Sequence, residues 1–194
     1  MISLHATQKL FSRLSLDQDG LLPSSERTAW MYEKPVLDIN PLSGWHAHQV
    51  TLHRRQCILM AHDLTRFPLV LPAVKKIDLA ELNDRFVDAL MNTLLKCGAE
   101  EFHLEAVHRC VRPLKIDVQC SRSVQGTLRI MKDEIECCLD DSNQHIADIT
   151  GYRMGARLAD TPRTVQGKEC KWPKKEMLTL LASLGNDAPT LGWP

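Results

Sequence analysis

The residues with the clearest potential for chemistry are two histidines, His46 and His48, in the segment HAHQVTLH. In an extended strand this spacing places both side chains on one face, and two imidazoles on one face suit a metal ion. A third ligand would have to come from another histidine or a cysteine, and the spacing identifies none. Because Val50 and Leu52 share that face, we interpret the pair as partly buried, hydrogen-bonded histidines and expect no metal site.

A second candidate is the segment SRSVQG, residues 121–126, at the start of a predicted helix. The free backbone N–H groups of a helix start, the hydroxyls of Ser121 and Ser123, and the guanidinium of Arg122 together suit an anion or a phosphate group. The same residues also suit an ordinary helix start, in which a serine caps the helix and the arginine is exposed to solvent. Both interpretations stay open from the sequence alone.

A third candidate is the basic pair Arg54 and Arg55, which stands between two predicted strands. A tight turn of residues 54–56 would let both long side chains reach solvent, where arginines contact phosphate groups or acidic partner surfaces. The candidate residues for binding an anion or a partner are therefore Arg54, Arg55, Ser121, Arg122 and Ser123.

The segment from Ser15 to Glu26 resembles a calcium-binding EF-hand loop, because Asp17 and Asp19 stand at positions that supply ligands. The match lacks a carboxylate at the first position and has a proline, Pro23, at the ninth. No second loop of this kind exists in the sequence to pair with it. We therefore expect an Asp-Gly turn capped by an aspartate rather than a calcium site.

Motifs of the common catalytic and nucleotide-binding sites are absent: the sequence has no GxSxG, P-loop, GxGxxG or HExxH. The 24 lysines and arginines balance 24 aspartates and glutamates, which argues against a protein that binds nucleic acid over its whole surface. We identify no catalytic residue and expect no cofactor. The sequence favours a protein that is not an enzyme.

The seven cysteines are an odd number and include no CxxC pair, which is typical of reduced cysteines in a cytoplasmic protein. Most of them stand on predicted apolar faces and are expected to act as small buried hydrophobic residues. No stretch approaches the ~18 apolar residues of a membrane-spanning helix, and the first residues lack the apolar core of a secretory signal. We expect a cytoplasmic protein that does not contact a membrane.

The apolar periodicity predicts an α+β fold, in which a small antiparallel β-meander packs against several amphipathic helices. The predicted strands are His46–His53, Cys57–His62, Arg66–Leu71 and Leu114–Val118. The predicted helices are Leu4–Leu14, Leu79–Cys97, Glu100–Cys110, a helix from Ser121 or Ser123 to about Leu139, Ile146–Leu158 and Lys174–Leu184. We expect one domain over residues 1–185, with a long loop excursion at 17–44, followed by a flexible tail at 186–194.

Three segments together resemble a known family. They are Thr7–Leu10, the stretch from Trp45 through the paired arginines to Arg66, and Ser121–Gly126. Over most of the chain from Leu4 to about Leu184, the sequence resembles a bacterial family of domains of unknown function, also seen at the front of some plasmid-borne open-reading-frame proteins. The resemblance implies a bacterial cytoplasmic protein tied to mobile elements, and it assigns neither an activity nor catalytic residues.

Two classes of function follow. The first is a non-enzymatic cytoplasmic binding or regulatory protein, an accessory factor of a bacterial mobile element that contacts nucleic acid or a host protein. The alternative is a hydrolytic or nucleic-acid-processing enzyme with an unfamiliar site around His46, His48 and Ser121–Ser123. Because the enzyme needs these groups close together, their positions in the folded chain distinguish the two classes.

Overall fold

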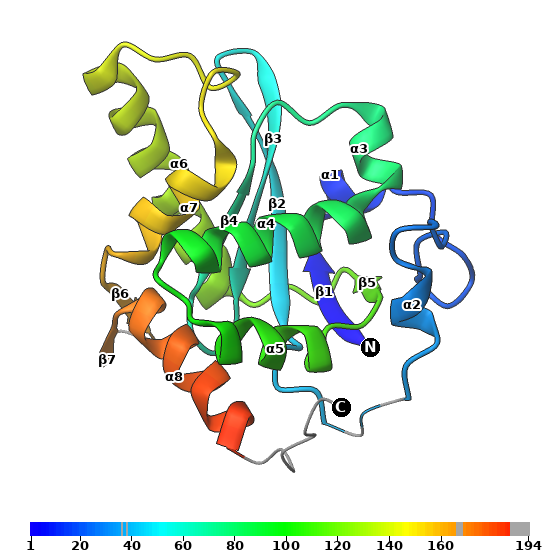
Figure 1. Cartoon of the computed structure of the whole chain (residues 1–194). Coiled ribbons are helices and arrows are strands. Elements are labelled where there is room, and N and C mark those ends of the chain that lie inside the picture. Colours follow the sequence, from blue (N-terminus) through cyan, green and yellow to red (C-terminus); the bar gives the residue numbers. More distant parts are fainter. Residues whose placement is uncertain (36, 38, 166–168, 187–194) are drawn as a thin grey trace.

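A mixed five-stranded sheet forms the centre of the structure, a computed structural model that describes residues 1–35, 37, 39–165 and 169–186 (Figure 1). The strands are β1 (Ile2–Ala6), β2 (Trp45–Leu52), β3 (Arg55–His62), β4 (Pro68–Leu71) and β5 (Leu114–Asp117). They lie in the order β4-β3-β2-β1-β5. β1 is parallel to both of its neighbours, whereas β3 is antiparallel to both β2 and β4.

The amino-terminal residues form a strand where we predicted a short helix over Leu4–Leu14. In β1, the buried Ile2, Leu4 and Ala6 alternate with partly exposed side chains. The apolar spacing has a helical period, but backbone pairing with β2 and β5 on either side holds β1 extended. Helix is limited to one turn, α1 (Gln8–Phe11). The sheet is therefore mixed and larger than the antiparallel meander that we predicted, although the α+β class is confirmed.

The predicted meander is present as β2, β3 and β4. β4 lies at the edge of the sheet, a position that suits Pro68 because proline cannot donate a hydrogen bond to a neighbouring strand. The turn between β2 and β3 is formed by His53 and Arg54 rather than by residues 54–56, and Arg55 already belongs to β3. Both turn residues have positive φ, 43° at His53 and 61° at Arg54, as in the two-residue hairpins whose twist matches that of their strands.

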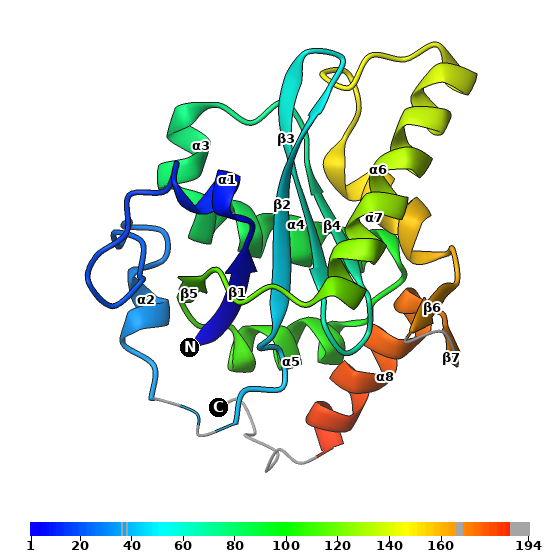
Figure 2. The ribbon, with the colours of Figure 1, turned by 180° about the vertical axis from the view of Figure 1, so that it is seen from behind.

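Helices cover the two faces of the sheet unequally (Figure 1, Figure 2). On one face, α4 (Leu82–Lys96), α5 (Glu101–Cys110) and α8 (Pro173–Asn186) pack over a core to which β1, β2, β3, β4 and β5 all contribute. On the other face, α6 (Arg122–Ser142) packs on β2 and β3, and α7 (Gly151–Ala159) packs on β4. β1 and β5 contribute no side chain to the core beneath α6. On this side, the two strands are not covered by a helix (Figure 2).

The main predicted helix is present but is interrupted near its start. A short helix, α3 (Lys76–Ala80), precedes α4. Asp78 was expected to precede and cap a helix beginning at Leu79, but its carboxylate accepts the backbone N–H of Lys75 at 2.7 Å and so caps α3 from within the first turn. The apolar stripe is buried as predicted, and its α4 members include Leu82, Phe86, Leu90 and Leu94.

The carboxy-terminal half follows the predicted order of elements with one addition. After Pro162, two short strands, β6 (Arg163–Val165) and β7 (Glu169–Lys171), pair in antiparallel fashion. Gly167, which stands between them in the sequence, lies outside the described residues. The last helix, α8, ends at Asn186, and the rest of the predicted tail lies outside the described residues. No helix in the part of the chain that the structure describes combines the length and apolar composition needed to cross a membrane.

The long segment at 17–44 contains a helical turn, α2 (Ala29–Tyr32), and covers the outer edge of β5. Gly20 accepts the backbone N–H of Ile116 at 2.8 Å. The carboxylate of Asp17 accepts the N–H groups of Asp19 and Leu21, each at 2.9 Å. The expectation of a capped Asp-Gly turn is therefore confirmed.

His62, at the end of β3, is fully buried beside the ring of Trp45. Its Nδ1 lies 2.9 Å from the hydroxyl of Thr65. Burial disfavours the charged imidazolium and lowers the pKa of His62 to about 4, although the nearby Asp63 acts in the opposite direction. The folded protein therefore holds His62 neutral where the unfolded chain would protonate it.

We predict that this histidine makes the protein less stable in mild acid. As the pH falls from 6.5 towards 4, only the unfolded state gains the proton, so the free energy of unfolding decreases by about 3 kcal/mol. Urea unfolding across this range measures the slope, which His62→Leu should reduce and the exposed-site control His53→Gln should not. Equal slopes for the wild type and His62→Leu would contradict the assignment.

Candidate functional site

Three polar side chains form a row across the sheet on the side of α6. In the strand register, His5 of β1 pairs with His46 of β2 and with Asp117 of β5. Their neighbours along each strand point into the opposite core, so the alternation of the strands turns these three towards the uncovered area beside α6. His5 Nδ1 lies 2.6 Å from Asp117 Oδ1, and the rings of His5 and His46 are 4.9 Å apart.

His46 uses both of its ring nitrogens in hydrogen bonds. Nε2 accepts the backbone N–H of Ser121 at 2.6 Å, and Nδ1 lies 2.6 Å from Asp63 Oδ1. Because a backbone N–H can only donate, Nε2 must be unprotonated, and Nδ1 therefore carries the proton and donates it to Asp63. The side chain is 3% exposed. His46 is thus a neutral histidine that is occupied on both sides, as the interpretation as a hydrogen-bonded histidine predicted.

The start of α6 is held by these contacts rather than by a serine cap. Ser121 occupies the N-cap position, but its hydroxyl makes no capping hydrogen bond. The hydroxyl of Ser123 accepts a hydrogen bond at 3.1 Å from Arg66, whose guanidinium also donates to the carbonyl of Asp63 at 2.7 Å. The expectation that Ser121 or Ser123 caps the helix with its side chain is therefore wrong, because His46 and Arg66 provide the contacts that fix this end.

The charges along α6 run against its dipole. The first turn contains no acidic residue, and the exposed Arg122 is its first residue. The last turns contain Asp140 and Asp141 and no basic residue. The positive end of a helix dipole normally attracts acidic side chains, and the negative end basic ones. α6 therefore concentrates positive potential at its start, where the first backbone N–H groups are free of side-chain caps.

A cavity of about 360 Å³ opens beside the first half of α6. His48 of β2 lines it, with Nδ1 3.2 Å from the hydroxyl of Thr7. Burial, and to a smaller extent the positive charge of Lys9, lowers the pKa of His48. The complete lining consists of Thr7, His48, Gln125, Gly126, Leu128, Arg129 and Lys132. No acidic residue belongs to it, so the cavity suits an anion.

The structure brings only part of the predicted site together. His46 contacts Ser121. His48 lies two residues further along β2, on the same face and beside α6. Arg54 is at the other end of α6, where the ring of His53 in the same turn lies 5.0 Å from the ring of His145 in a tilted arrangement. Because the 21 residues of α6 span about 30 Å, Arg54 and Arg55 are far from the start of α6 and form a separate surface. Figure 2 shows how α6 runs along the sheet towards the tip of the β2–β3 hairpin.

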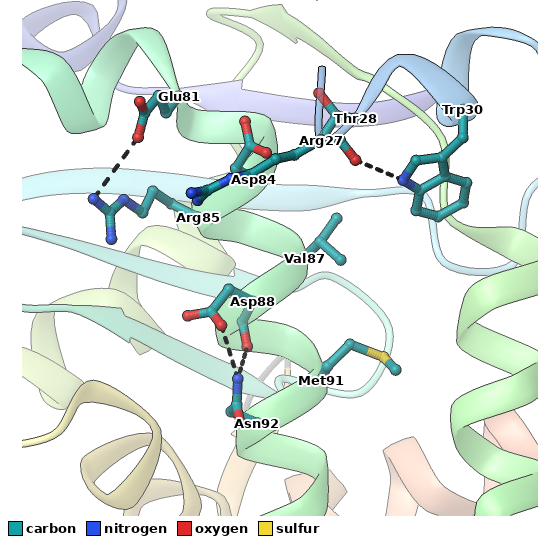
Figure 3. A pocket seen from close by; sticks show the side chains of 10 residues that line it. All are labelled: Arg27, Thr28, Trp30, Glu81, Asp84, Arg85, Val87, Asp88, Met91 and Asn92. Carbon is teal, nitrogen blue, oxygen red and sulfur yellow. Dashed lines mark hydrogen bonds and ion pairs between the residues drawn. The ribbon is translucent and has the colours of Figure 1, made fainter. Parts of the chain in front are cut away.

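A second hollow, of about 480 Å³, lies beside α4 on the other face of the sheet (Figure 3). Its Arg85 forms ion pairs with Asp78 and Glu81. Asp88 accepts a hydrogen bond at 2.9 Å from the side chain of Asn92, one turn further along α4. Among its other charged lining residues, Asp84 accepts a hydrogen bond from Ser25 at 2.9 Å. The hollow lies on the other face from the site that the sequence indicated.

Among the residues that the structure describes, no group of three or more His, Cys, Asp or Glu side chains is arranged to hold a metal ion. All seven cysteines are free. Cys57 and Cys97 are buried, and burial raises the pKa of Cys97 to about 11. Cys137 and Cys170 are exposed, so the expectation of buried thiols holds for only part of the set.

Sequence reasoning missed His5, Asp63, Asp117 and Arg66. His5 and Asp117 are 112 residues apart in the chain and meet only because β1 lies between β2 and β5. The alternation of apolar and polar residues in Ile2–Ala6 (ISLHA) was the available signal, since in a strand it places His5 on the face opposite the apolar residues.

We predict that His46 is essential for folding stability. His46→Leu would leave the N–H of Ser121 and the carboxylate of Asp63 without their partner, which should lower the free energy of unfolding by about 2–4 kcal/mol. The matched control is His48→Leu on the same strand face, which should cost about 1 kcal/mol or less. Denaturant unfolding measures both, and equal losses in the two variants would show that His46 has no special role.

Comparison with known proteins gives a family but no activity. No curated protein and no solved structure matches the chain significantly. The model of a family described as a domain of unknown function, DUF6933, matches residues 3–176 and so includes all of the sheet except Ile2, together with α6 and the cavity. The resemblance to a family of unknown function is therefore confirmed, and the chain belongs to the DUF6933 family.

Proposed function

We propose that the protein is a non-enzymatic binding protein that contacts an anionic partner, with nucleic acid as the partner class, through the start of α6. The contacting residues are Ser121, Arg122 and Ser123. In keeping with the bacterial, mobile-element context that the sequence resemblance implies, we propose a role as a cytoplasmic accessory or regulatory factor.

The observation that carries this proposal is the distribution of charge on α6. Placing Arg122 in the first turn and Asp140 and Asp141 in the last is unfavourable for the helix itself, by about 0.3–1 kcal/mol for each charge. A bound phosphate would make the positive charge at the start of α6 favourable, because it would meet both the free N–H groups and the guanidinium of Arg122. An arrangement that is costly in isolation and favourable with an anion indicates binding.

The scaffold beneath this surface also supports binding. His46 and Arg66 hold the start of α6 against β2 and the turn after β3. Because these contacts exist without a ligand, the N–H groups of the first turn are already in place and little ordering is required when an anion binds. A preformed surface of this kind can bind a partner without catalysing a reaction.

Arg54 and Arg55 are proposed as a second, separate contact. A partner that reached both surfaces would have to pass the carboxy-terminal half of α6, which carries Asp133, Asp140 and Asp141 on exposed positions. Those carboxylates repel phosphate. We therefore assign the main contact to the start of α6 and a weaker one to the hairpin tip, where a host protein is the other partner class.

The enzyme alternative is favoured by one observation, the His5–Asp117 pair at 2.6 Å. A carboxylate on Nδ1 orients an imidazole so that Nε2 can act as a general base. His46, one of the residues around which the sequence placed this enzyme site, has both ring nitrogens in hydrogen bonds, to Asp63 and to the N–H of Ser121, so His5 is the better candidate for a base. A hydrolytic activity abolished by His5→Gln in a stably folded variant would favour the enzyme.

We predict that Arg122→Gln weakens binding to a single-stranded oligonucleotide and lowers the dependence of log K on log salt by about 1, because one phosphate contact is lost. Fluorescence anisotropy at several salt concentrations measures both quantities. Arg153→Gln, at an exposed position of α7, removes the same charge elsewhere and serves as the control. Arg54→Gln with Arg55→Gln should have the smaller effect.

Three outcomes would argue against the proposal: no binding by the wild type at low salt, equal losses in Arg122→Gln and Arg153→Gln, or loss only in the hairpin variant. The last of these would move the contact to the tip of β2 and β3.

A further inference from the structure

Residues from three parts of the fold line the cavity beside α6. It is bounded by β2, by the residue that follows β1, and by the second and third turns of α6. Arg129 and Lys132 of α6 line it, and the charge of Lys9 on α1 reaches His48 on its floor. These cations come from elements far apart in the sequence, and only the fold assembles them.

Two of these cations are free to meet a ligand. Lys132 pairs with Glu136 one turn further along α6, at 2.7 Å. Lys9 and Arg129 have no ion pair within the described part of the chain, and both are exposed. An anion in the cavity would therefore meet the unpaired Arg129 without displacing an existing partner, while Lys9, which does not line the cavity, adds positive charge near His48.

Gly126 keeps the cavity open. It stands inside α6, where glycine is less favourable than alanine because it leaves the backbone more freedom to lose. A Cβ added at Gly126 would meet nothing within 4 Å, whereas one at Gly151 would lie 2.2 Å from a backbone oxygen. Packing therefore requires glycine at Gly151 but not at Gly126. Gly126 is exposed and lines the cavity, so a larger side chain at this position would stand at the edge of the cavity.

His48 and Thr7 provide polar groups at the floor. Their mutual contact at 3.2 Å occupies His48 Nδ1. No hydrogen bond to His48 Nε2 exists among the described residues, so this nitrogen is available to a ligand. Gln125, on the rim, adds an amide that can donate. The site thus combines positive charge with neutral donors, as phosphate groups require.

We propose that this cavity binds a phosphate group, either of a mononucleotide or of the terminal nucleotide of a nucleic-acid strand. The inference rests on the proposed function and names the group that enters the protein: the strand would pass Arg122, and its terminal phosphate would lie between His48 and Arg129. Ligand pockets of about 300–1,000 Å³ hold small molecules, and the 360 Å³ here is sufficient for a phosphate and part of its nucleoside.

The test measures binding of inorganic phosphate and of a nucleoside monophosphate by calorimetry at low salt, with the unphosphorylated nucleoside as the control ligand. We expect the nucleotide to bind and the nucleoside not to bind. Arg129→Gln should weaken binding about tenfold, the loss of one charge-assisted contact. Arg153→Gln, which removes an exposed arginine of α7, should leave the affinity unchanged.

Gly126→Leu separates a blocked cavity from an unfolded protein. Leucine is a better helix former than glycine, so this variant should melt at a higher temperature than the wild type while losing the ligand. Loss of binding together with a raised melting temperature supports the cavity. Full binding by Gly126→Leu would overturn it, because the site would then lie elsewhere.

The source of the phosphate is distinguished with two oligonucleotides, one with and one without a 5′-phosphate. Stronger binding of the phosphorylated strand, abolished by Gly126→Leu, assigns the cavity to a strand end. Binding of the mononucleotide with no preference between the strands assigns it to a free nucleotide. If Arg122→Gln weakens both strands equally and no phosphate compound binds the cavity, the proposed function stands and this inference fails. If the mononucleotide binds the cavity of the wild type and of Arg122→Gln equally, and no strand binds, the cavity inference stands and the proposed function fails.

Discussion

The arrangement of the site depends on one buried imidazole. His46 donates to Asp63 in the turn after β3 and accepts the N–H of Ser121 at the start of α6, so a single side chain of β2 joins three parts of the chain. Because Nε2 accepts the N–H of Ser121, the ring carries its single proton on Nδ1 and is neutral. Because Arg66 adds a second link from the same turn to Ser123, the start of α6 has little freedom to move. The helix that carries the candidate binding residues is therefore positioned by the sheet before any partner arrives.

The fold then leaves room beside that helix. α6 covers β2 and β3 but not β1 and β5, and the cations Arg129 and Lys132 of α6 line a cavity together with His48 of β2 and with Thr7, which follows β1. A histidine with both nitrogens occupied suits a scaffold better than a catalyst, which is why we favour binding over hydrolysis. The cavity and the basic start of α6 lie about one helical turn apart, and this proximity lets one anionic partner use both.

Local patterns were sufficient to predict most of the longer elements, but not β1, the β6–β7 pair or the contacts that make the site. The stripe of α4 and the alternation of β2 and β3 are periodic over many residues, and the start of α6 was found from its polar segment. β1 was missed because five residues carry little periodic signal and its neighbours in the sheet come from distant segments. His46 was identified from its type and strand face, but its partners lie 17 and 75 residues away in the chain, and no local rule relates such positions. The separation of Arg54 from Arg122 likewise follows from the direction of α6, which only the fold defines.

The most direct test of the account is a titration of the isotopically labelled protein with inorganic phosphate, followed by amide chemical shifts in NMR spectra. The account predicts that the largest saturable shifts occur at Gln125, Gly126 and Arg129 of α6 and at His48, with smaller shifts at the first turn of α6. Shifts confined to the hairpin tip at Arg54 and Arg55, or spread without saturation over the exposed cations of the whole surface, would contradict it.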